Sequence, residues 1–269
     1  PLFDIEAASA CNARCVFCPR EAAAPRPRIM HPGVFASILA FLPENAVVMF
    51  SGFGEPLLNP HLEDFARSLK GRGISPCVIT NGLLLTPERQ ASLIAAGMDQ
   101  FQVSLHAAEP GPWRRIVGLE GGWERVKANL DHLARHRPDG FRVNLNFVES
   151  TDNEAEGPAV EEMAHRLGFT FFARRVHGRG GEVEEPRTGR PPGCGIYASV
   201  TFIDAAGDVR ACVNDVKGAT RFGAVGDVSW AGVLAWKRKG LRNLRLFPVC
   251  SQCDDDYRFV ILAQGGVEG

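Results

Sequence analysis

The sequence predicts an α/β fold in which six βα units form an open barrel, followed by a small domain of a β-hairpin and an α-helix. The first observation behind this prediction is that short apolar runs typical of strands alternate with amphipathic stretches up to residue 175. The second is that a hairpin pattern and a scattered group of cysteines replace this alternation after residue 193. We therefore expect one unit over residues 1–180 and a smaller one over residues 181–269.

The first unit contains six predicted strands, at Phe3–Ala7, Val47–Ser51, Ser75–Thr80, Gln100–Leu105, Arg142–Val148 and Thr170–Arg174. Helices are predicted between them at Val34–Phe41, Leu62–Arg72, Pro87–Ala96, Trp123–His136 and Ala159–Leu167. Thr86 suits the N-cap of the third helix, and Gly97 suits its end. Six βα units are fewer than the eight of a closed TIM barrel, so we expect a partial (β/α)6 TIM-like barrel with functional residues at the carboxyl ends of its strands.

The second unit follows a stretch rich in Gly, Pro, Arg and Glu over residues 176–193, which fits a linker or an active-site loop. A hairpin is predicted from Tyr197–Asp204 and Asp208–Cys212, with its turn at residues 205–207. A helix is expected at Trp230–Lys239. The pair Cys250 and Cys253 follows it.

Charge and hydropathy exclude several kinds of partner. The formal net charge is -1 and both signs are interspersed, so we expect neither a nucleic acid nor an anionic membrane as partner. No apolar run approaches the length of about 20 residues that a membrane helix needs, and the first residues lack the pattern of a secretory signal. We expect a cytoplasmic protein with a small-molecule substrate, whose eight cysteines serve metal or redox chemistry rather than disulfides.

Three cysteines, Cys11, Cys15 and Cys18, lie in the loop after the first predicted strand, where a barrel places its chemistry. Three thiolates can hold a [4Fe-4S] cluster and leave its fourth iron without a protein ligand. Zinc fits these cysteines less well, because it usually takes four ligands. This CxxxCxxC pattern resembles the signature of the radical S-adenosylmethionine (SAM) superfamily.

Further residues occur in the order that this resemblance requires. The segment Gly52, Phe53, Gly54, Glu55 resembles the glycine-rich motif whose backbone meets the SAM amino group, although Phe53 separates the glycines and an ordinary βα turn is the alternative. The resemblance also implies SAM contacts from later strand ends, namely Thr80, Asn81, Ser104 and Asn144, with Asn146 on the same face as Asn144. It implies that one electron cleaves SAM and that the resulting radical removes a hydrogen atom from an unactivated carbon.

A second set of cysteines comprises Cys194, Cys212, Cys250 and Cys253. The spacing of Cys194, Gly207 and Cys212 resembles the SPASM/Twitch extension of radical SAM enzymes, in its shorter Twitch form. The resemblance implies a second, auxiliary [4Fe-4S] cluster, while a zinc ribbon suits the same count of ligands. Cys77, on the third strand, is expected to face the surrounding helices as an inert thiol.

The layout resembles radical SAM oxidoreductases that convert a secondary alcohol of a carbohydrate or aminocyclitol to a ketone, as in antibiotic biosynthesis. The resemblance implies an electron donor such as flavodoxin or ferredoxin. Catalytic candidates at the barrel mouth are His177, Arg175, Arg179 and Asp215, with Asn214 beside the last; a solvated loop side chain is the alternative for each.

Three other functions remain open. Two are radical chemistry: epimerisation, and peptide modification by a RiPP maturase. We expect the peptide alternative to be weaker, because the first predicted strand begins at Phe3 and leaves no room for an N-terminal peptide-recognition domain. The third is a non-enzymatic zinc-binding module, which gives no reason for the cysteine loop to occur with the glycine-rich motif.

Overall fold

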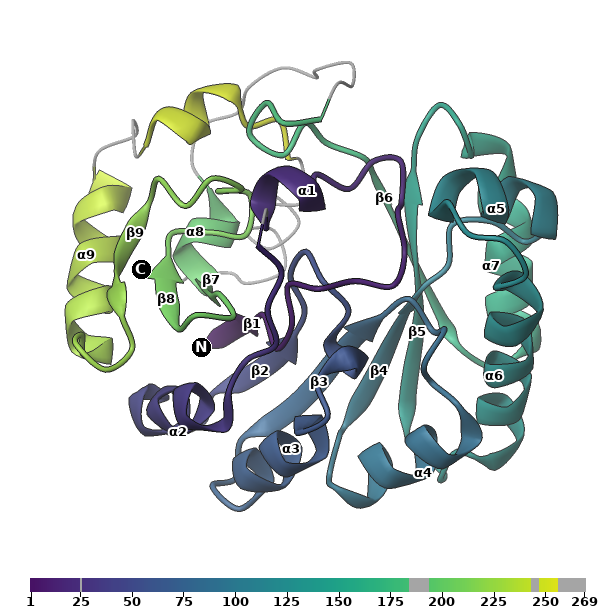
Figure 1. The fold of residues 1–269 in the computed structure, drawn as a ribbon, viewed down its shortest axis with the longest axis horizontal. Helices are drawn as coiled ribbons and strands as arrows, with labels where there is room; N and C mark the ends of the chain where they lie inside the picture. Colours follow the sequence, from purple (N-terminus) through teal and green to yellow (C-terminus); the bar gives the residue numbers. More distant parts are fainter. Residues whose placement is uncertain (25, 184–193, 243–246, 256–269) are drawn as a thin grey trace.

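The computed structural model describes residues 1–24, 26–183, 194–242 and 247–255. Its centre is one nine-stranded sheet in the order β6-β5-β4-β3-β2-β1-β7-β8-β9. The first six strands are parallel, and they are β1 (Leu2–Ile5), β2 (Val47–Phe50), β3 (Ser75–Thr80), β4 (Gln100–Ser104), β5 (Arg142–Glu149) and β6 (Thr170–Arg175). The predicted α/β class and the partial parallel barrel are confirmed (Figure 1).

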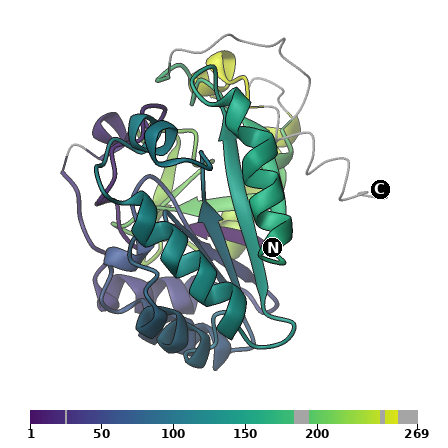
Figure 2. The ribbon, with the colours of Figure 1, turned by 90° about the vertical axis from the view of Figure 1, so that its right-hand side faces the viewer.

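Helices cover the outer side of the curved sheet, as two perpendicular views show (Figures 1 and 2). The predicted helices are found as α2 (Pro32–Phe41), α3 (Leu62–Lys70), α4 (Pro87–Ala95), α6 (Trp123–His136) and α7 (Gly157–Arg166). The sequence did not predict the short α1 (Arg20–Ala23) or α5 (Pro110–Val117), nor the 3-10 helices η1 (Pro56–Leu58) and η2 (Glu154–Glu156). The prolines at the start of α5 resemble helix breakers in sequence, but a first helical turn tolerates them.

The second part of the chain continues the same sheet. Its elements are α8 (Gly195–Ser199), β7 (Val200–Ile203), β8 (Asp208–Arg210), β9 (Arg221–Ala224), α9 (Trp230–Arg242) and η3 (Pro248–Gln252). Strand β7 pairs in parallel with β1, whereas β8 and β9 are antiparallel. The predicted hairpin is therefore correct in place but begins too early, because Tyr197 lies in α8. All four residues of β7 are buried, as expected for a strand inside a sheet.

Aromatic side chains join the two parts into one core. Phe35 and Phe65 stack with ring centroids 4.0 Å apart between α2 and α3. Trp230, at the start of α9, packs on Phe3 of β1 at 5.0 Å and on Phe41 of α2 at 6.1 Å. Burial of such rings contributes roughly 1.5–3 kcal/mol each. The second part is thus anchored directly on the first strand of the barrel.

Candidate functional site

The loop between β1 and α1 carries Cys11, Cys15 and Cys18 across the open mouth of the barrel (Figure 1). The backbone N–H groups of Arg14 and Val16 donate to carbonyls at the end of α5, each at 2.9 Å. The N–H of Cys18 donates to the carbonyl of Cys15 at 3.0 Å and closes a turn. The loop is therefore held in a defined shape by backbone hydrogen bonds on two sides.

The three thiols of this loop lie close enough to influence one another. Burial, together with the charges of Cys18 and Cys11, raises the pKa of Cys15 to about 12. The sulfur of Cys11 accepts a hydrogen bond from the N–H of Ala13 at 3.4 Å. Over the described ranges of the chain, no three His, Cys, Asp or Glu side chains are placed to hold a single metal ion.

The glycine-rich segment after β2 packs against the same loop. A Cβ atom at Gly54 would lie 2.0 Å from the carbonyl oxygen of Ala8, so only glycine fits there. The N–H of Glu55 donates to the carbonyl of Ala10 at 2.8 Å. Gly52 has a φ of 123°, a conformation that other residues rarely adopt. The segment therefore follows the path of the loop that leads to the first cysteine.

Glu55 connects this segment to the end of β3. Its carboxylate accepts hydrogen bonds from Leu57 N at 3.0 Å, from the Thr80 hydroxyl at 2.8 Å and from Asn81 N at 2.8 Å. Asn81 in turn donates to the side chain of Asn12 at 2.7 Å and lies 3.9 Å from the sulfur of Cys11. The structure thus brings the predicted residues Glu55, Thr80 and Asn81 together beside the first cysteine.

Glu6 was not predicted, although it holds the glycine-rich segment in place. One oxygen of its buried carboxylate accepts from the N–H of Phe53 at 3.0 Å. The other accepts from the N–H of Ala205 at 3.3 Å, in the turn between β7 and β8. Glu6 therefore ties the predicted SAM segment to the second part of the chain.

The side of the sheet that faces away from the helices is lined by polar residues. Strand register places Gln102 beside Asn144 and Ser104 beside Asn146, and Asn146 donates to Gln102 at 2.9 Å. The side-chain oxygen of Asn146 has no hydrogen-bond partner. The predicted residues Ser104 and Asn144 thus share one polar face. Gln102 lies on the same face and was not predicted.

Cys77 lies on this polar face, and the prediction that it faces the helices is wrong. Its neighbour Val78 belongs to the hydrophobic core, so alternation along β3 turns Cys77 to the other side. There the thiol lies 3.9 Å from the side-chain oxygen of Gln100. Burial raises the pKa of Cys77 to about 11, so that the thiol stays protonated.

Asp4 is a charged residue on the same face that the sequence analysis missed. Its neighbours Phe3 and Ile5 are fully buried in the core, so Asp4 points into the barrel. The hydroxyl of Ser51 donates to its carboxylate. Burial raises the pKa of Asp4 to about 6, while the hydrogen bond from Ser51 and the charges of Arg179 and Arg174 oppose this shift.

The predicted catalytic residues differ in where they lie. Arg179 lies at the barrel mouth with its guanidinium carbon 5.9 Å from the ring centroid of Phe53. Arg175 is mostly exposed. Neighbouring side chains of a strand point to opposite faces of the sheet, and it is the charge of Arg174, not of Arg175, that lowers the pKa of Asp4. Asp215 accepts from the N–H groups of Ala219 and Thr220, and so caps a turn.

His177 is 4% exposed, and both of its ring nitrogens have neighbours. Nδ1 accepts from the N–H of Arg179 at 3.3 Å, and Nε2 lies 3.4 Å from a carboxylate oxygen of Asp255. Burial lowers the pKa of His177, which keeps the ring neutral. This geometry gives His177 a role in joining β6 to the residues after Cys253, and its role as a base stays a prediction.

Asn214 completes this connection. Its side-chain oxygen accepts from the guanidinium of Arg179 at 3.1 Å, and its amide donates to Asp255 at 2.7 Å. Its backbone N–H donates to the sulfur of Cys212 at 3.2 Å. One buried residue therefore touches both the barrel mouth and the second set of cysteines.

The second set of cysteines gathers around α8. Cys194 is the N-cap of this helix, and its sulfur accepts from the N–H of Tyr197 at 3.4 Å. Burial raises the pKa of Cys212, and the charges of Cys194 and Cys253 raise it further. The charge of Cys250 likewise raises the pKa of Tyr197. Cys194, Cys212 and Cys253 thus lie near enough to influence one another, and Cys250 lies near Tyr197 of α8. These four thiols are the residues that could hold a second cluster.

Lys237 of α9 is buried beside these cysteines, and no sequence signal marked it. The side chain is 3% exposed, although lysine is rarely buried. Burial lowers the pKa of Lys237 to about 8, while Cys212 and Cys194 oppose this shift. A positive charge in this position is unusual enough to require an explanation.

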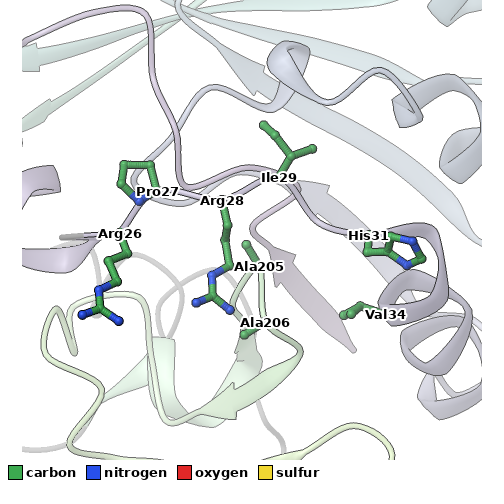
Figure 3. A pocket seen from close by; sticks show the side chains of 8 residues that line it. All are labelled: Arg26, Pro27, Arg28, Ile29, His31, Val34, Ala205 and Ala206. Carbon is green, nitrogen blue, oxygen red and sulfur yellow. The ribbon is translucent and has the colours of Figure 1, made fainter.

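A separate pocket of about 390 Å³ lies between residues 26–34 and the turn that joins β7 to β8 (Figure 3). It is lined by Arg26, Pro27, Arg28, Ile29, His31, Val34, Ala205 and Ala206. It contains none of the predicted site residues. In the part of the chain that the structure describes, no helix is both long enough and apolar enough to cross a membrane.

Comparisons with known proteins agree with this geometry. A curated relative, the AdoMet-dependent heme synthase of Methanosarcina barkeri, is 33% identical over 142 residues, covering 52% of this chain and 40% of the relative. A PqqA peptide cyclase of Ruegeria pomeroyi is 34% identical over 123 residues, covering 46% and 31% respectively. This chain thus spans less than half the length of either relative.

Among solved structures, BtrN in complex with AdoMet and 2-DOIA superposes with a TM-score of 0.67 and 19% identity, covering 95% of this chain and 93% of BtrN. At this identity the likeness concerns the fold. The family model described as Radical SAM superfamily matches residues 5–156, which include the cysteine loop and the glycine-rich segment. Because this match covers more than half of the chain, the protein belongs to the radical SAM superfamily of enzymes.

Proposed function

We propose that this enzyme oxidises a secondary alcohol of a carbohydrate or aminocyclitol to a ketone, and that Cys194, Cys212, Cys250 and Cys253 hold an auxiliary [4Fe-4S] cluster. The observation that carries the proposal is the position of Asn214, which contacts Arg179 at the barrel mouth and Cys212 of the second set. An oxidation that leaves an electron on the substrate requires an acceptor close to the reacting carbon. The second cysteine set adjoins the site where such an acceptor is needed.

The residues around the barrel mouth fit the two groups that the family uses. Cys11, Cys15 and Cys18 would hold the first [4Fe-4S] cluster, and the backbone of residues 52–55 would bind the amino end of SAM. Asn81, Ser104 and Asn144 complete the proposed SAM site. When bound, these groups supply the radical chemistry that removes a hydrogen atom from carbon, with flavodoxin or ferredoxin as the proposed electron source.

The chain's own residues would position the alcohol and accept its proton. Asp4 is the proposed proton acceptor, because its carboxylate lies on the polar face and titrates near neutral pH. Arg179 is the proposed partner of the hydroxyl oxygen, because its guanidinium lies over Phe53 and is fixed by Asn214. A C=O bond would replace C–O–H if the bound groups took one hydrogen atom and one electron from the substrate and Asp4 accepted the hydroxyl proton.

The polar face supports a hydroxylated substrate rather than an apolar one. Gln102, Asn144 and Asn146 present amide groups to the inside of the barrel, and the oxygen of Asn146 is without a partner. Such groups favour ligands that donate several hydrogen bonds. A polyol or an amino-substituted ring has donors around its whole edge.

Peptide modification is the second candidate, and the identity with a PqqA peptide cyclase over the barrel favours it. Both candidates use the same barrel, so the substrate distinguishes them.

The test is an anaerobic assay in heavy water with the reconstituted enzyme, SAM, dithionite and either 2-deoxy-scyllo-inosamine or scyllo-inositol. Oxidation predicts 5'-deoxyadenosine together with a product two mass units lighter than the substrate. The Cys212→Ala variant is expected to cleave SAM but to form no ketone. Formation of an epimer of the substrate with one carbon-bound deuterium and no ketone would show epimerisation and contradict the proposal.

A further inference from the structure

Helix α9 places a positive charge inside the second part of the chain. The ammonium group of Lys237 donates to the carbonyl of Tyr197 at 2.9 Å and to that of Val200 at 2.5 Å. Both carbonyls lie at the end of α8, the helix that Cys194 begins. The ammonium is also 5.3 Å from the ring centroid of Tyr197. Lys237 is thus fixed against the helix that begins at Cys194, one member of the second cysteine set.

No carboxylate among the described residues forms an ion pair with Lys237. Two carbonyls and one ring do not neutralise an ammonium group that is only 3% exposed, and such burial is costly. The thiols of Cys212 and Cys194 lie near enough for their charge to act on the ammonium. Among the described residues, these two thiols would balance the charge of Lys237 once ionised, as they would be when ligating a metal cluster.

A fixed cation changes the redox behaviour of a cluster in a known direction. Reduction adds one negative charge, and a nearby cation stabilises the reduced form more than the oxidised one. Net charge and burial are among the factors that set the potentials of iron-sulfur clusters. An ammonium next to the cysteine ligands therefore raises the reduction potential and makes the cluster a better electron acceptor.

We propose that Lys237 acts through its charge to raise the reduction potential of the auxiliary cluster, so that this cluster can accept the electron removed from the substrate. This inference rests on the proposed auxiliary cluster. It assigns a role in the redox step to a residue of α9 whose hydrogen bonds are made to Tyr197 and Val200.

The experiment measures the midpoint potential of the auxiliary cluster by redox titration followed by electron paramagnetic resonance. The full chain with Cys11, Cys15 and Cys18 changed to Ala carries only the second cluster, so its signal is unmixed. Two neutral variants are compared in this background, Lys237→Met and Lys237→Gln; the glutamine can still donate to a carbonyl. Lys237→Arg keeps the charge, and Lys239→Met removes an exposed lysine from the same helix as a matched control.

The expected result is that both neutral variants are about tenfold harder to reduce, a fall of about 59 mV for a one-electron couple, while the Arg variant and Lys239→Met keep the parent potential. If Lys237→Met loses its iron, the midpoint potential of Lys237→Gln is measured instead, and the same fall is expected. An unchanged potential in a neutral variant that retains its iron would overturn the inference and leave Lys237 as a cap of α8. Absence of iron from the parent protein itself would instead contradict the proposed auxiliary cluster.

Discussion

The two cysteine sites differ in how the chain builds them and in the charges around them. The first comes from one loop of eight residues, and beside its sulfurs lie backbone N–H groups, the amide of Asn81 and the partly exposed cations Arg179 and Arg20. The second is assembled from α8, the loop after β8 and η3, and has the ammonium of Lys237 beside it. A site with an open iron needs room for a ligand, whereas a site that only receives electrons benefits from burial and a fixed cation.

The two sites should also differ in what the protein loses when their cysteines are replaced. The loop of the first site can lose its cysteines without disturbing the strands, because backbone hydrogen bonds to α5 hold it. The cysteines of the second set come from segments that are far apart in sequence, so a cluster bound by them would also hold tertiary structure together. We expect losses at the first site to remove chemistry, and losses at the second site to remove chemistry and stability together.

The largest expected effect comes from changing Cys11, Cys15 and Cys18 to Ala together. We expect SAM cleavage to disappear and the iron content to fall from about eight to about four atoms per chain, because one of two four-iron clusters is lost. Anaerobic iron, sulfide and zinc analysis measures this, with Cys77→Ala as the control because that thiol lies apart from both sites. Zinc in the variant, in place of the remaining iron, would contradict the assignment of the second site.

The next effect concerns Asp4→Asn. Ketone formation should fall by about 100-fold, the lower range for loss of a general base. Ionised Asp4 is the proton acceptor, so in the wild type the rate should rise as pH increases through about 6, and the variant should lack this rise. Because folding raises this pKa, the unfolding free energy of the wild type should also decrease from about pH 4 to 6, and the variant should lose that decrease. A rise through pH 6 that persists in the variant would exclude Asp4 as its source.

Sequence reasoning succeeded where the signal was local. The three cysteines of the first loop and the glycine-rich segment are short motifs, and in the structure this segment packs on the start of the cysteine loop. Strand and helix positions were also recovered, because apolar periodicity is set by the same core that Phe35 and Phe65 form. The family that these motifs resembled is the family to which the chain belongs.

Sequence reasoning failed where a face or a distant contact decides the role. Arg175 was chosen over Arg174, and one residue along a strand is enough to move a side chain to the opposite face. Asp4 is a lone acid in an apolar strand, and Lys237 lies in a basic run of an amphipathic helix that resembles a solvated surface. Nothing local distinguishes such residues, because their environment is created by β7, α8 and the cysteines after the strands.

A smaller effect is expected for Gly54→Ala, which tests the contact between the glycine-rich segment and the cysteine loop. The added methyl would overlap the backbone at Ala8, where no side chain can move away, so we expect a loss of about 3 kcal/mol in unfolding free energy and weaker SAM binding. Gly226→Ala is the matched control, since nothing lies within 4 Å of its added Cβ. Equal unfolding curves for the two variants would contradict the close packing.

Two links join the loop after β6 to the loop after β8, one buried and one exposed. Asn214→Ala removes the buried link to Arg179 and Asp255, and we expect a loss of about 2 kcal/mol, because polar groups inside the protein lose a partner. Urea unfolding of the anaerobic protein measures this loss. A stability equal to that of the wild type would mean that the two parts of the chain are held together without this connection.

The smallest effect is expected for Lys217→Ala, which removes the exposed link. The ammonium of Lys217 lies 2.6 Å from a carboxylate oxygen of Glu182, but the lysine side chain is 68% exposed. Water and salt screen such a pair, so we expect a change below about 1 kcal/mol that shrinks further in high salt. The same urea series, repeated with added salt, measures it. A loss as large as that of Asn214→Ala would show that the exposed contact holds these two loops together as strongly as the buried amide does.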